Sequence, residues 1–180
     1  MLSHCECPRC GARHDPETLL GVCHCGSPLL ARYDLDHVRR HVTPHDIRER
    51  PADLWRYREL LPVGTHCAVV TMGEGWTPLV SIRRYGTRIG VPNLVMKDES
   101  GLPTGSFKAR GAAVGVSMAW ELGVRRLAMP TNGNAGAAWA LYAARANIAS
   151  TIGIEIAKQR TKCRVGSPVS QPAVGRWRKA

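Results

Sequence analysis

The pattern of hydrophobic positions is clearest in the second half of the chain. Residues 92–97 contain a short apolar run that predicts a β-strand, and residues 107–122, rich in Ala, Met, Val and Trp, predict a helix that ends at Gly123. Residues 125–129 predict a second strand, and the alanine-rich residues 134–148 predict a second helix. This order of strand, helix, strand, helix predicts an α/β fold with a parallel sheet and a right-handed crossover.

Two earlier stretches predict packing elements. Residues 72–80 combine two glycines, a Trp and a Thr-Pro step, which predicts a loop that leads into a strand and can line a pocket. Residues 54–61 predict a short helix that docks onto a larger body and ends at Pro62. Its apolar face would consist of Leu54, Trp55, Tyr57, Leu60 and Leu61.

A cluster of cysteines near the N-terminus predicts a zinc-ribbon-like module. Five of the seven cysteines lie in residues 5–25, and each of two close pairs is followed by a glycine that permits a tight turn. The predicted ligands of one structural zinc ion are Cys7, Cys10, Cys23 and Cys25. The second pair is one residue closer than usual, so substitute ligands stay open, namely His4, Cys5 and His24. A reduced, metal-free hairpin is the alternative.

Composition and charge narrow the class of protein. The chain is 44% hydrophobic and 22% charged, as is ordinary for a soluble globular protein. More than half of its net charge of +11 lies in residues 149–180, whereas the cysteine-rich segment is not basic, which disfavours nucleic-acid binding by that segment. Because no long apolar stretch and no secretion signal are present, we expect a cytoplasmic protein that does not contact a membrane.

Lys108 is the first candidate for chemistry. Residues 103–106 predict a turn, with Ser106 as the N-cap of the following helix, so Lys108 lies in the first helical turn. The free backbone N–H groups there favour anions, so the site favours a neutral lysine amine. A neutral amine is the nucleophile that forms a Schiff base with an aldehyde such as pyridoxal phosphate. The alternative is an ordinary surface lysine.

A second loop, residues 131–136, follows the second predicted strand. It offers Asn134 and several backbone N–H groups at a helix N-terminus, which suit a phenolate, a carboxylate or a phosphate. Ligands of parallel sheets bind beyond the carboxyl ends of the strands, so we expect Lys108 and this loop to share one edge. The alternative is a glycine-rich turn with a helix cap.

Five motifs together carry a resemblance to a known family. The segments CPRCG, CHCG, GEGWTPL, KDESGLPTGSFKARG and TNGNAGAA, in this order, resemble threonine synthase, a family of fold type II that depends on pyridoxal phosphate. The resemblance covers about residues 7–148. PTGSFKARG and GNAG also resemble threonine and serine dehydratases, whereas the cysteine-rich start and GEGWTPL favour threonine synthase.

The resemblance implies a reaction and a role for each site residue. Lys108 matches the lysine that holds the cofactor and moves protons on the substrate, and Asn134 matches the asparagine that hydrogen-bonds the 3′ oxygen of the cofactor. The substrate carboxylate would contact Thr131, Asn132 and Gly133, although the family usually has a small hydroxyl residue in place of Asn132. The family converts O-phospho-L-homoserine and water to L-threonine and phosphate, and a homo-oligomer is compatible with the full-length protein.

The resemblance also implies a division of the chain. We expect a zinc-ribbon-like module in residues 1–30, a linker with the docking helix in 31–66, the N-terminal part of the pyridoxal-phosphate domain in 67–154 and a basic tail foreign to the fold in 155–180. The family's glycine-rich phosphate loop has no counterpart after Ile148. We therefore expect a truncated form that binds the cofactor weakly. A dehydratase-like enzyme and a zinc-ribbon binding module without catalysis stay open.

Overall fold

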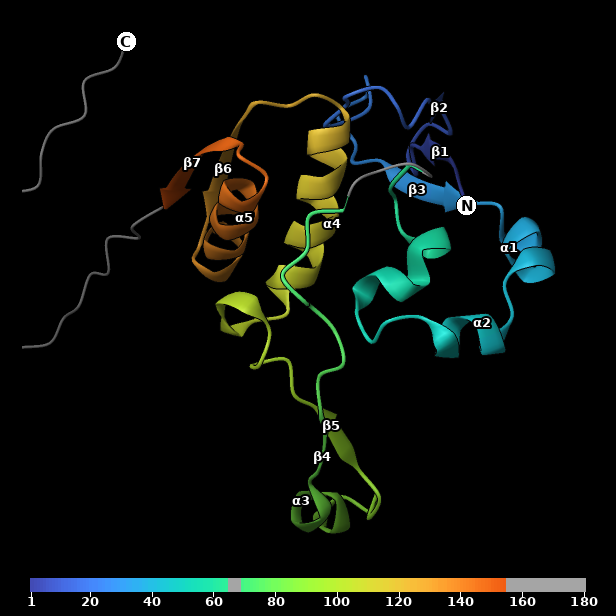
Figure 1. Cartoon of the computed structure of the whole chain (residues 1–180), viewed down its shortest axis with the longest axis vertical. Coiled ribbons are helices and arrows are strands. Elements are labelled where there is room, and N and C mark those ends of the chain that lie inside the picture. The colour runs from blue at the N-terminus through green and yellow to red at the C-terminus, as the bar shows by residue number, and fades with distance from the viewer. Residues whose placement is uncertain (65–68, 155–180) are drawn as a thin grey trace, which may run out of the picture.

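The computed structural model describes residues 1–64 and 69–154, so the predicted boundary at 66/67 and the predicted tail at 155–180 lie outside the described residues. The described part is a mixed α/β structure with three small sheets (Figure 1). None of its helices is long and apolar enough to cross a membrane.

The N-terminal module is a three-stranded antiparallel sheet in the order β2-β1-β3. Its strands are β1 (Leu2–Glu6), β2 (Arg13–His14) and β3 (Leu30–Tyr33). The two predicted turns are confirmed, because Gly11 and Gly26 follow the cysteine pairs with φ of +72° and +79°. The backbone N–H of Gly11 donates to the Cys7 carbonyl and that of Gly26 to the Cys23 carbonyl. Each turn thereby folds a pair of cysteines toward one point.

Two short helices, α1 (Leu35–His41) and α2 (Pro44–Glu49), follow the module. The Asp34 carboxylate caps α1 by accepting from the backbone N–H of His37. Thr43 and Asp46 form a reciprocal capping box on α2, which also has proline at its first position. These local signals explain why such short segments are helical although neither buries a residue.

The predicted docking helix is a 3₁₀-helix, η1 (Leu54–Leu60). Leu54 and Trp55 pack against the core as predicted, but the prediction was wrong for Tyr57 and Leu60, which are 46% and 43% exposed. Three residues per turn and a kink at Tyr57 replace the expected period of 3.6, so a single apolar face does not form.

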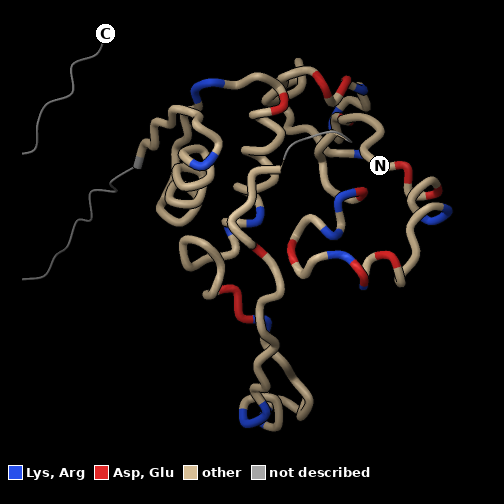
Figure 2. Tube along the Cα trace, in the orientation of Figure 1, with Lys and Arg blue, Asp and Glu red and all other residues tan. Residues whose placement is uncertain are grey.

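Arg56 is buried in place of the predicted apolar residues of η1. Its Nε donates to the Ile47 carbonyl at 3.1 Å, and its guanidinium lies 4.8 Å from the centroid of the Trp76 ring. Arg50 pairs with Glu59 nearby, with N···O distances of 2.7 Å, and Figure 2 shows basic and acidic positions close to one another in this segment. These contacts attach α2 to η1.

The single parallel sheet that the sequence predicts for the two strands flanking the Lys108 helix does not form. β5 (Val95–Lys97) pairs antiparallel with β4 (Leu79–Ser81) and not with β6 (Arg126–Thr131). The short helix α3 (Arg83–Arg88) joins β4 to β5, and Figure 1 shows this unit well away from β6. The prediction was wrong because an apolar run identifies a strand but not its partner.

A parallel pair of strands does form, between β6 and the strand that follows it in the chain. β6 pairs in parallel with β7 (Ala149–Ile154), from Arg126 opposite Ala149 to Thr131 opposite Ile154, and α5 (Asn134–Arg145) connects the two strands. A further strand of the sheet, β7, therefore follows directly after Ile148.

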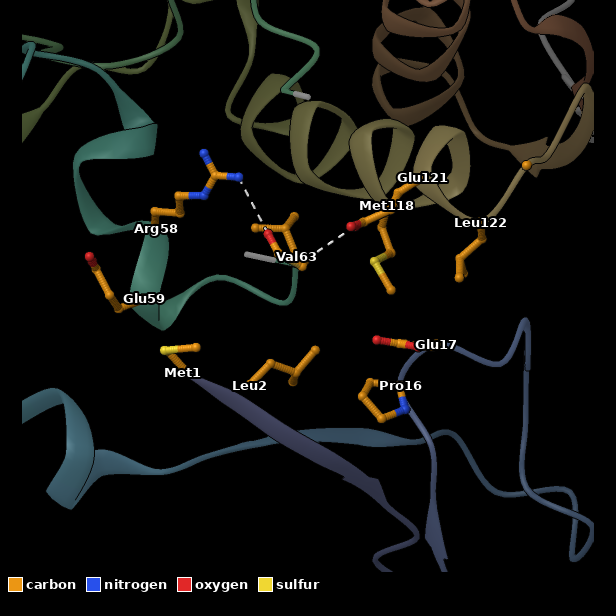
Figure 3. A pocket seen from close by; sticks show the side chains of 12 residues that line it. Met1, Leu2, Pro16, Glu17, Arg58, Glu59, Val63, Met118, Glu121 and Leu122 are labelled. Atoms are coloured by element: carbon orange, nitrogen blue, oxygen red, sulfur yellow. Dashed lines mark hydrogen bonds between the residues drawn. The ribbon is translucent and has the colours of Figure 1, made fainter. Parts of the chain in front are cut away.

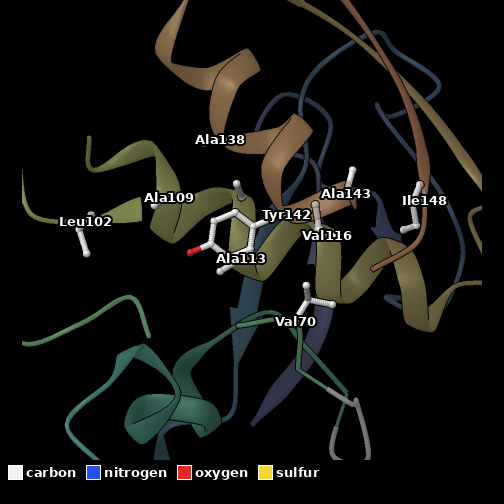
Figure 4. Packing of buried hydrophobic residues seen from close by; sticks show 10 residues of the cluster. Val70, Leu102, Ala109, Ala113, Val116, Ala138, Tyr142, Ala143 and Ile148 are labelled. Atoms are coloured by element: carbon white, nitrogen blue, oxygen red, sulfur yellow. The ribbon is translucent and has the colours of Figure 1, made fainter. Parts of the chain in front are cut away.

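The helix α4 (Lys108–Glu121) packs against α5, and the core lies between and around them. Their contact faces are rich in alanine and glycine, so the backbones approach closely: a Cβ atom on Gly115 would lie 2.6 Å from Cη2 of Trp139. Tyr142 is fully buried on α5, and Figure 4 shows its ring beside Ala113 of α4. The core comprises Val70, Leu102, Ala109, Ala112, Ala113, Val116, Ala138, Tyr142, Ala143 and Ile148.

Candidate functional site

Lys108 is the first residue of α4, as predicted for the first helical turn. Its Nζ lies 4.3 Å from the centroid of the Phe107 ring, and no carboxylate of the described residues forms an ion pair with it. The prediction that Ser106 caps the helix was wrong, because Phe107 already has helical backbone angles and occupies the N-cap position. The Ser106 hydroxyl is buried and accepts no backbone N–H; within the described ranges it has no hydrogen-bond partner.

The turn that delivers Lys108 contains two consecutive residues with positive φ. It is the short 3₁₀-helix η2 (Pro103–Gly105), in which Thr104 has φ +66° and Gly105 has φ +67°. Glycine accepts this conformation without cost, whereas threonine is strained in it. The backbone N–H of Gly105 donates to the carbonyl of the buried Leu102, which fixes the turn to the core. The turn predicted over residues 103–106 is thus confirmed.

The second loop joins β6 to α5 and is closed by Thr131. The Thr131 Oγ1 accepts from the backbone N–H groups of Gly133 at 3.2 Å and Gly136 at 3.0 Å. A side chain on Gly136 would collide with Thr131 and Ile152, so glycine is required where α5 starts against the sheet. The threonine hydroxyl keeps its own proton for donation, because both of these bonds use its oxygen as the acceptor.

The structure brings all the residues predicted to bind cofactor and substrate to one cavity. A cavity of about 610 Å³ is lined by Lys108 and by residues 130–135, which include Thr131, Asn132, Gly133 and Asn134. The packing of α4 against α5 brings Lys108 close to the 130–135 loop. The adjacent parallel strands that the sequence predicted for this purpose do not form.

An ion-pair network beside Lys108 was missed by the sequence analysis. The Arg110 guanidinium donates to both carboxylate oxygens of Glu99, at 2.7 and 3.0 Å, and Thr77 Oγ1 donates to Glu99 at 2.6 Å. The hydrogen bond from Arg110 is the main cause that lowers the pKa of Glu99 to about 2. Lys97 Nζ donates to the Thr77 carbonyl at 2.9 Å. The five charged residues in the fifteen-residue motif 97–111 were a signal, but only the fold shows which of them pair.

A fully buried carboxylate, Glu74, was also missed. It accepts hydrogen bonds from Trp55 Nε1 at 2.9 Å, Thr71 Oγ1 at 3.0 Å, the backbone N–H of Met72 at 2.9 Å and the Tyr142 hydroxyl at 2.6 Å. Burial, together with the bond to Glu74, raises the pKa of the Tyr142 hydroxyl. The sequence offered no signal for this burial, because a glutamate between two loop glycines, as in residues 73–75, is ordinarily exposed.

The four predicted cysteine ligands converge on one point. All four sulfur atoms lie within 4.8 Å of one another, with 3.5 Å between Cys7 and Cys25 and 3.7 Å between Cys10 and Cys23. A tetrahedral zinc ion with bonds of about 2.3 Å separates its sulfur ligands by about 3.8 Å, so the cluster has the size of such a site.

The cysteine cluster also favours ionisation of one sulfur. Burial opposes ionisation of Cys7, but the backbone N–H groups of Cys10 and Arg9 stabilise its thiolate, and its pKa falls to about 6. The backbone N–H of Ala12 favours the Cys10 thiolate, yet the neighbouring Cys7 sulfur and burial raise the pKa of Cys10 to about 12. Ionisation of all four sulfurs would therefore need a cation among them.

A larger cavity, of about 870 Å³, lies between the N-terminal sheet, η1 and the C-terminal end of α4. Arg58 donates to the Gly64 carbonyl at 3.4 Å, and the backbone N–H of Gly64 donates to Glu121 at 3.1 Å across its wall (Figure 3). The cavity contains none of the predicted site residues. Size therefore does not identify the site, whereas the grouping of Lys108 with the 130–135 loop does.

The chain matches one family model and several curated proteins. Residues 70–162 match the family model described as pyridoxal-phosphate dependent enzyme, so the match continues beyond Ile148. A threonine synthase of Methanocaldococcus jannaschii is 38% identical over 140 residues, which are 78% of this chain and 35% of that protein. A threonine synthase of Methanosarcina acetivorans is 37% identical over 146 residues, 81% of this chain and 35% of that protein.

A third relative matches a shorter stretch. The threonine synthase of Halalkalibacterium halodurans is 42% identical over 95 residues, which are 53% of this chain and 27% of that protein. The chain thus spans about a third of the length of the curated relatives that it matches over most of its own length.

Proposed function

Because the chain belongs to the family of pyridoxal-phosphate dependent enzymes, we propose that it carries the reactive lysine of a threonine synthase-like protein. The observation that carries the proposal is the cavity shared by Lys108 and residues 130–135. A lysine amine, an amide side chain and a helix N-terminus meet there. This set of groups suits an aromatic aldehyde that bears a phenolic oxygen.

The residues present fit the cofactor. Lys108 would hold its aldehyde carbon, and the absence of an ion-paired carboxylate among the described residues leaves the amine available. Asn134, at the first position of α5, would hydrogen-bond the 3′ oxygen through its side-chain amide. When bound, the cofactor supplies an electron sink for negative charge that develops on substrate carbon atoms. Lys108 holds and moves the proton at those carbons with its Nζ.

The proposed substrate is O-phospho-L-homoserine, which water converts to L-threonine and phosphate. The names of the matching relatives support this reaction over the β-elimination chemistry of dehydratases, which would use the same Lys108 and Asn134. The substrate carboxylate is received by Thr131, Asn132 and Gly133. The Thr131 hydroxyl donates to it while its oxygen holds the loop closed.

The cysteine cluster has a separate, structural role in this proposal. Cys7, Cys10, Cys23 and Cys25 bind one zinc ion with four sulfur ligands and no open position for water. The ion takes the place of a hydrophobic core that a module of residues 1–30 is too small to form. The module, the docking segment and the lysine-bearing domain are the proposed units of the chain, and the protein acts in the cytoplasm.

Covalent trapping tests the role of Lys108. The purified full chain is incubated with pyridoxal phosphate, reduced with borohydride and mapped by peptide mass spectrometry, so that even weak binding leaves a permanent label. We expect the label mainly on Lys108, and we expect at least a tenfold lower labelling of the K108R variant, which keeps the charge but cannot form a Schiff base under these conditions. Labelling spread evenly over the other lysines, unchanged in K108R, would contradict the proposal.

A further inference from the structure

A second group of metal ligands lies beside the four-sulfur cluster. It consists of His14, Cys23 and His24, whose ligand atoms all lie within 4.8 Å of one another. His14 ends β2, and the other two lie in the second cysteine turn, so the N-terminal sheet brings together residues that are ten positions apart. Cys23 belongs to both groups, which makes its sulfur the point where they join.

The distances in this second group suit a single ion. The Sγ of Cys23 lies 3.4 Å from Nδ1 of His24. Sulfur and nitrogen ligands of a tetrahedral zinc ion, with bonds of about 2.3 and 2.0 Å, are separated by about 3.5 Å. The rings of His14 and His24 are inclined by 56°, with centroids 6.4 Å apart, so they do not stack and leave room for an ion between their nitrogens.

One ring nitrogen of His14 also lacks a hydrogen bond among the described residues. Its Nε2 is buried, and within the described ranges it has no hydrogen-bond partner. A buried imidazole nitrogen without a partner is costly, and coordination to a metal ion would remove that cost. His24 is exposed, so an ion can enter from solvent on that side.

Charge balance favours a second cation. Four thiolates carry a charge of about −4 and one divalent ion neutralises half of it, which leaves a partly buried excess of negative charge. A second divalent ion on neutral imidazoles would neutralise the remainder. A thiolate has enough lone pairs to bridge two ions, and Cys23 is the sulfur in position to do so because it is buried between the two groups.

We propose that the N-terminal module binds two divalent transition-metal ions bridged by the Cys23 thiolate. The first ion is held by the four cysteines, and the second by Cys23, His14 and His24. Three protein ligands leave a fourth position of the second ion for water, so this ion is the more weakly held and the more exchangeable. The inference rests on the proposed four-sulfur site.

Metal titration of the full chain tests this arrangement. Anaerobic, metal-free protein is titrated with Co²⁺, which reports thiolate and imidazole ligation in its absorption spectrum, and zinc content is measured separately on zinc-loaded protein. We expect about two ions per chain, with the second binding step changing the sulfur-to-cobalt absorption of the first. The H14A and H24A variants should bind about one ion and keep the four-sulfur spectrum, which also reports that the module is folded.

The H41A variant is the matched control, because His41 is an exposed histidine on α1 that stacks on His37 outside the ligand group. It should still bind two ions. One ion per chain in the parent protein, unchanged in H14A and H24A, would overturn the second site and leave the four-sulfur site standing. Two ions in all three histidine variants would also overturn it. No bound ion at all would overturn both sites.

Discussion

A hydrogen bond between the side chains of Glu74 and Tyr142 connects two distant segments of the chain. The 2.6 Å hydrogen bond between them spans 68 positions in the sequence and attaches α5 to the loop before β4. Trp55 Nε1 reaches the same carboxylate from η1. Since α5 starts at Asn134, the buried carboxylate helps to hold the proposed cofactor contact in place without lying in the cavity itself.

The Y142F variant should lower the free energy of unfolding by about 1–3 kcal/mol, because it removes a donor from a buried carboxylate and leaves the ring packing intact. The measurement is the midpoint of urea unfolding, compared with the parent chain. Y85F is the control, since the Tyr85 ring is 56% exposed. Equal midpoints for Y142F and Y85F would show that the bond contributes nothing to stability.

At the scale of single residues, the sequence indicates where candidate residues lie better than it indicates their partners. Lys108 and Asn134 were predicted from the turns that precede them, because turn chemistry is local. The bonds of Glu74 could not be predicted, because its donors come from three separate segments. Ser106 was misassigned since the exact cap position depends on one pair of backbone angles, and these place Phe107 at the N-cap.

Among the elements, the start of α4 is held by the pair of Glu99 and Arg110. Arg110 lies in the first turn of α4 and Glu99 follows β5, so their hydrogen bonds of 2.7 and 3.0 Å connect the Lys108 helix to the β4–β5 unit. Thr77, just before β4, donates to the same carboxylate. The pair therefore positions the N-terminus of the helix that carries Lys108.

The stability contributed by Glu99 should depend on pH in acid. Its pKa is about 2 in the folded chain and about 4.3 when unfolded, so the contribution is present above pH 4.3 and is lost as pH falls toward 2. We expect the parent chain to be more stable than E99Q by on the order of 1 kcal/mol at pH 6, after solvent screening, and this difference should vanish by about pH 2.

Chemical denaturation of both proteins across this pH range provides the measurement. E49Q is a suitable control, because Glu49 is exposed on α2 and forms no ion pair within the described ranges. A difference between the parent chain and E99Q that stays constant with pH would show that the Glu99–Arg110 pair is not the cause.

Helices and strands were predicted far better than their pairing. The helices predicted at 107–122 and 134–148 occur as α4 and α5, within three residues at each end, because their composition and glycine boundaries are local signals. The partner of β5 was mistaken, since pairing depends on how β4 returns through α3. The face of η1 was mistaken because the sequence pattern was read with the period of an α-helix.

At the scale of the whole molecule, the described residues surround the proposed cofactor site on one side only. The cavity is lined by Lys108 and by one continuous loop, and the matched stretch is about a third of the length of the curated relatives. The β4–β5 unit also exposes apolar side chains, among them Leu79 at 67% and Val95 at 51%. Contacts to the phosphate group provide much of a cofactor's affinity and orientation. Among the described residues, the cavity is lined by Lys108 and residues 130–135, without a second glycine-rich loop to provide those contacts.

The 180-residue chain should therefore release phosphate from O-phospho-L-homoserine at a negligible rate, at least a thousandfold below a full-length threonine synthase, even with excess pyridoxal phosphate. A continuous assay of inorganic phosphate, with such an enzyme as the positive control, makes the comparison. Phosphate release at a comparable rate that disappears in K108R would refute the expectation and would show that the residues present suffice for turnover.

Gly115 bears on how the cavity could change during evolution. It lies two helical turns after Lys108, and any side chain at this position would press into Trp139 of α5. Even one added methyl group would require a shift of the Trp139 ring or of α5, which begins at Asn134, relative to the helix that carries Lys108. Families that need a wider or narrower distance between these groups can therefore obtain it by exchanges at residues 115 and 139, while every residue that lines the cavity stays the same.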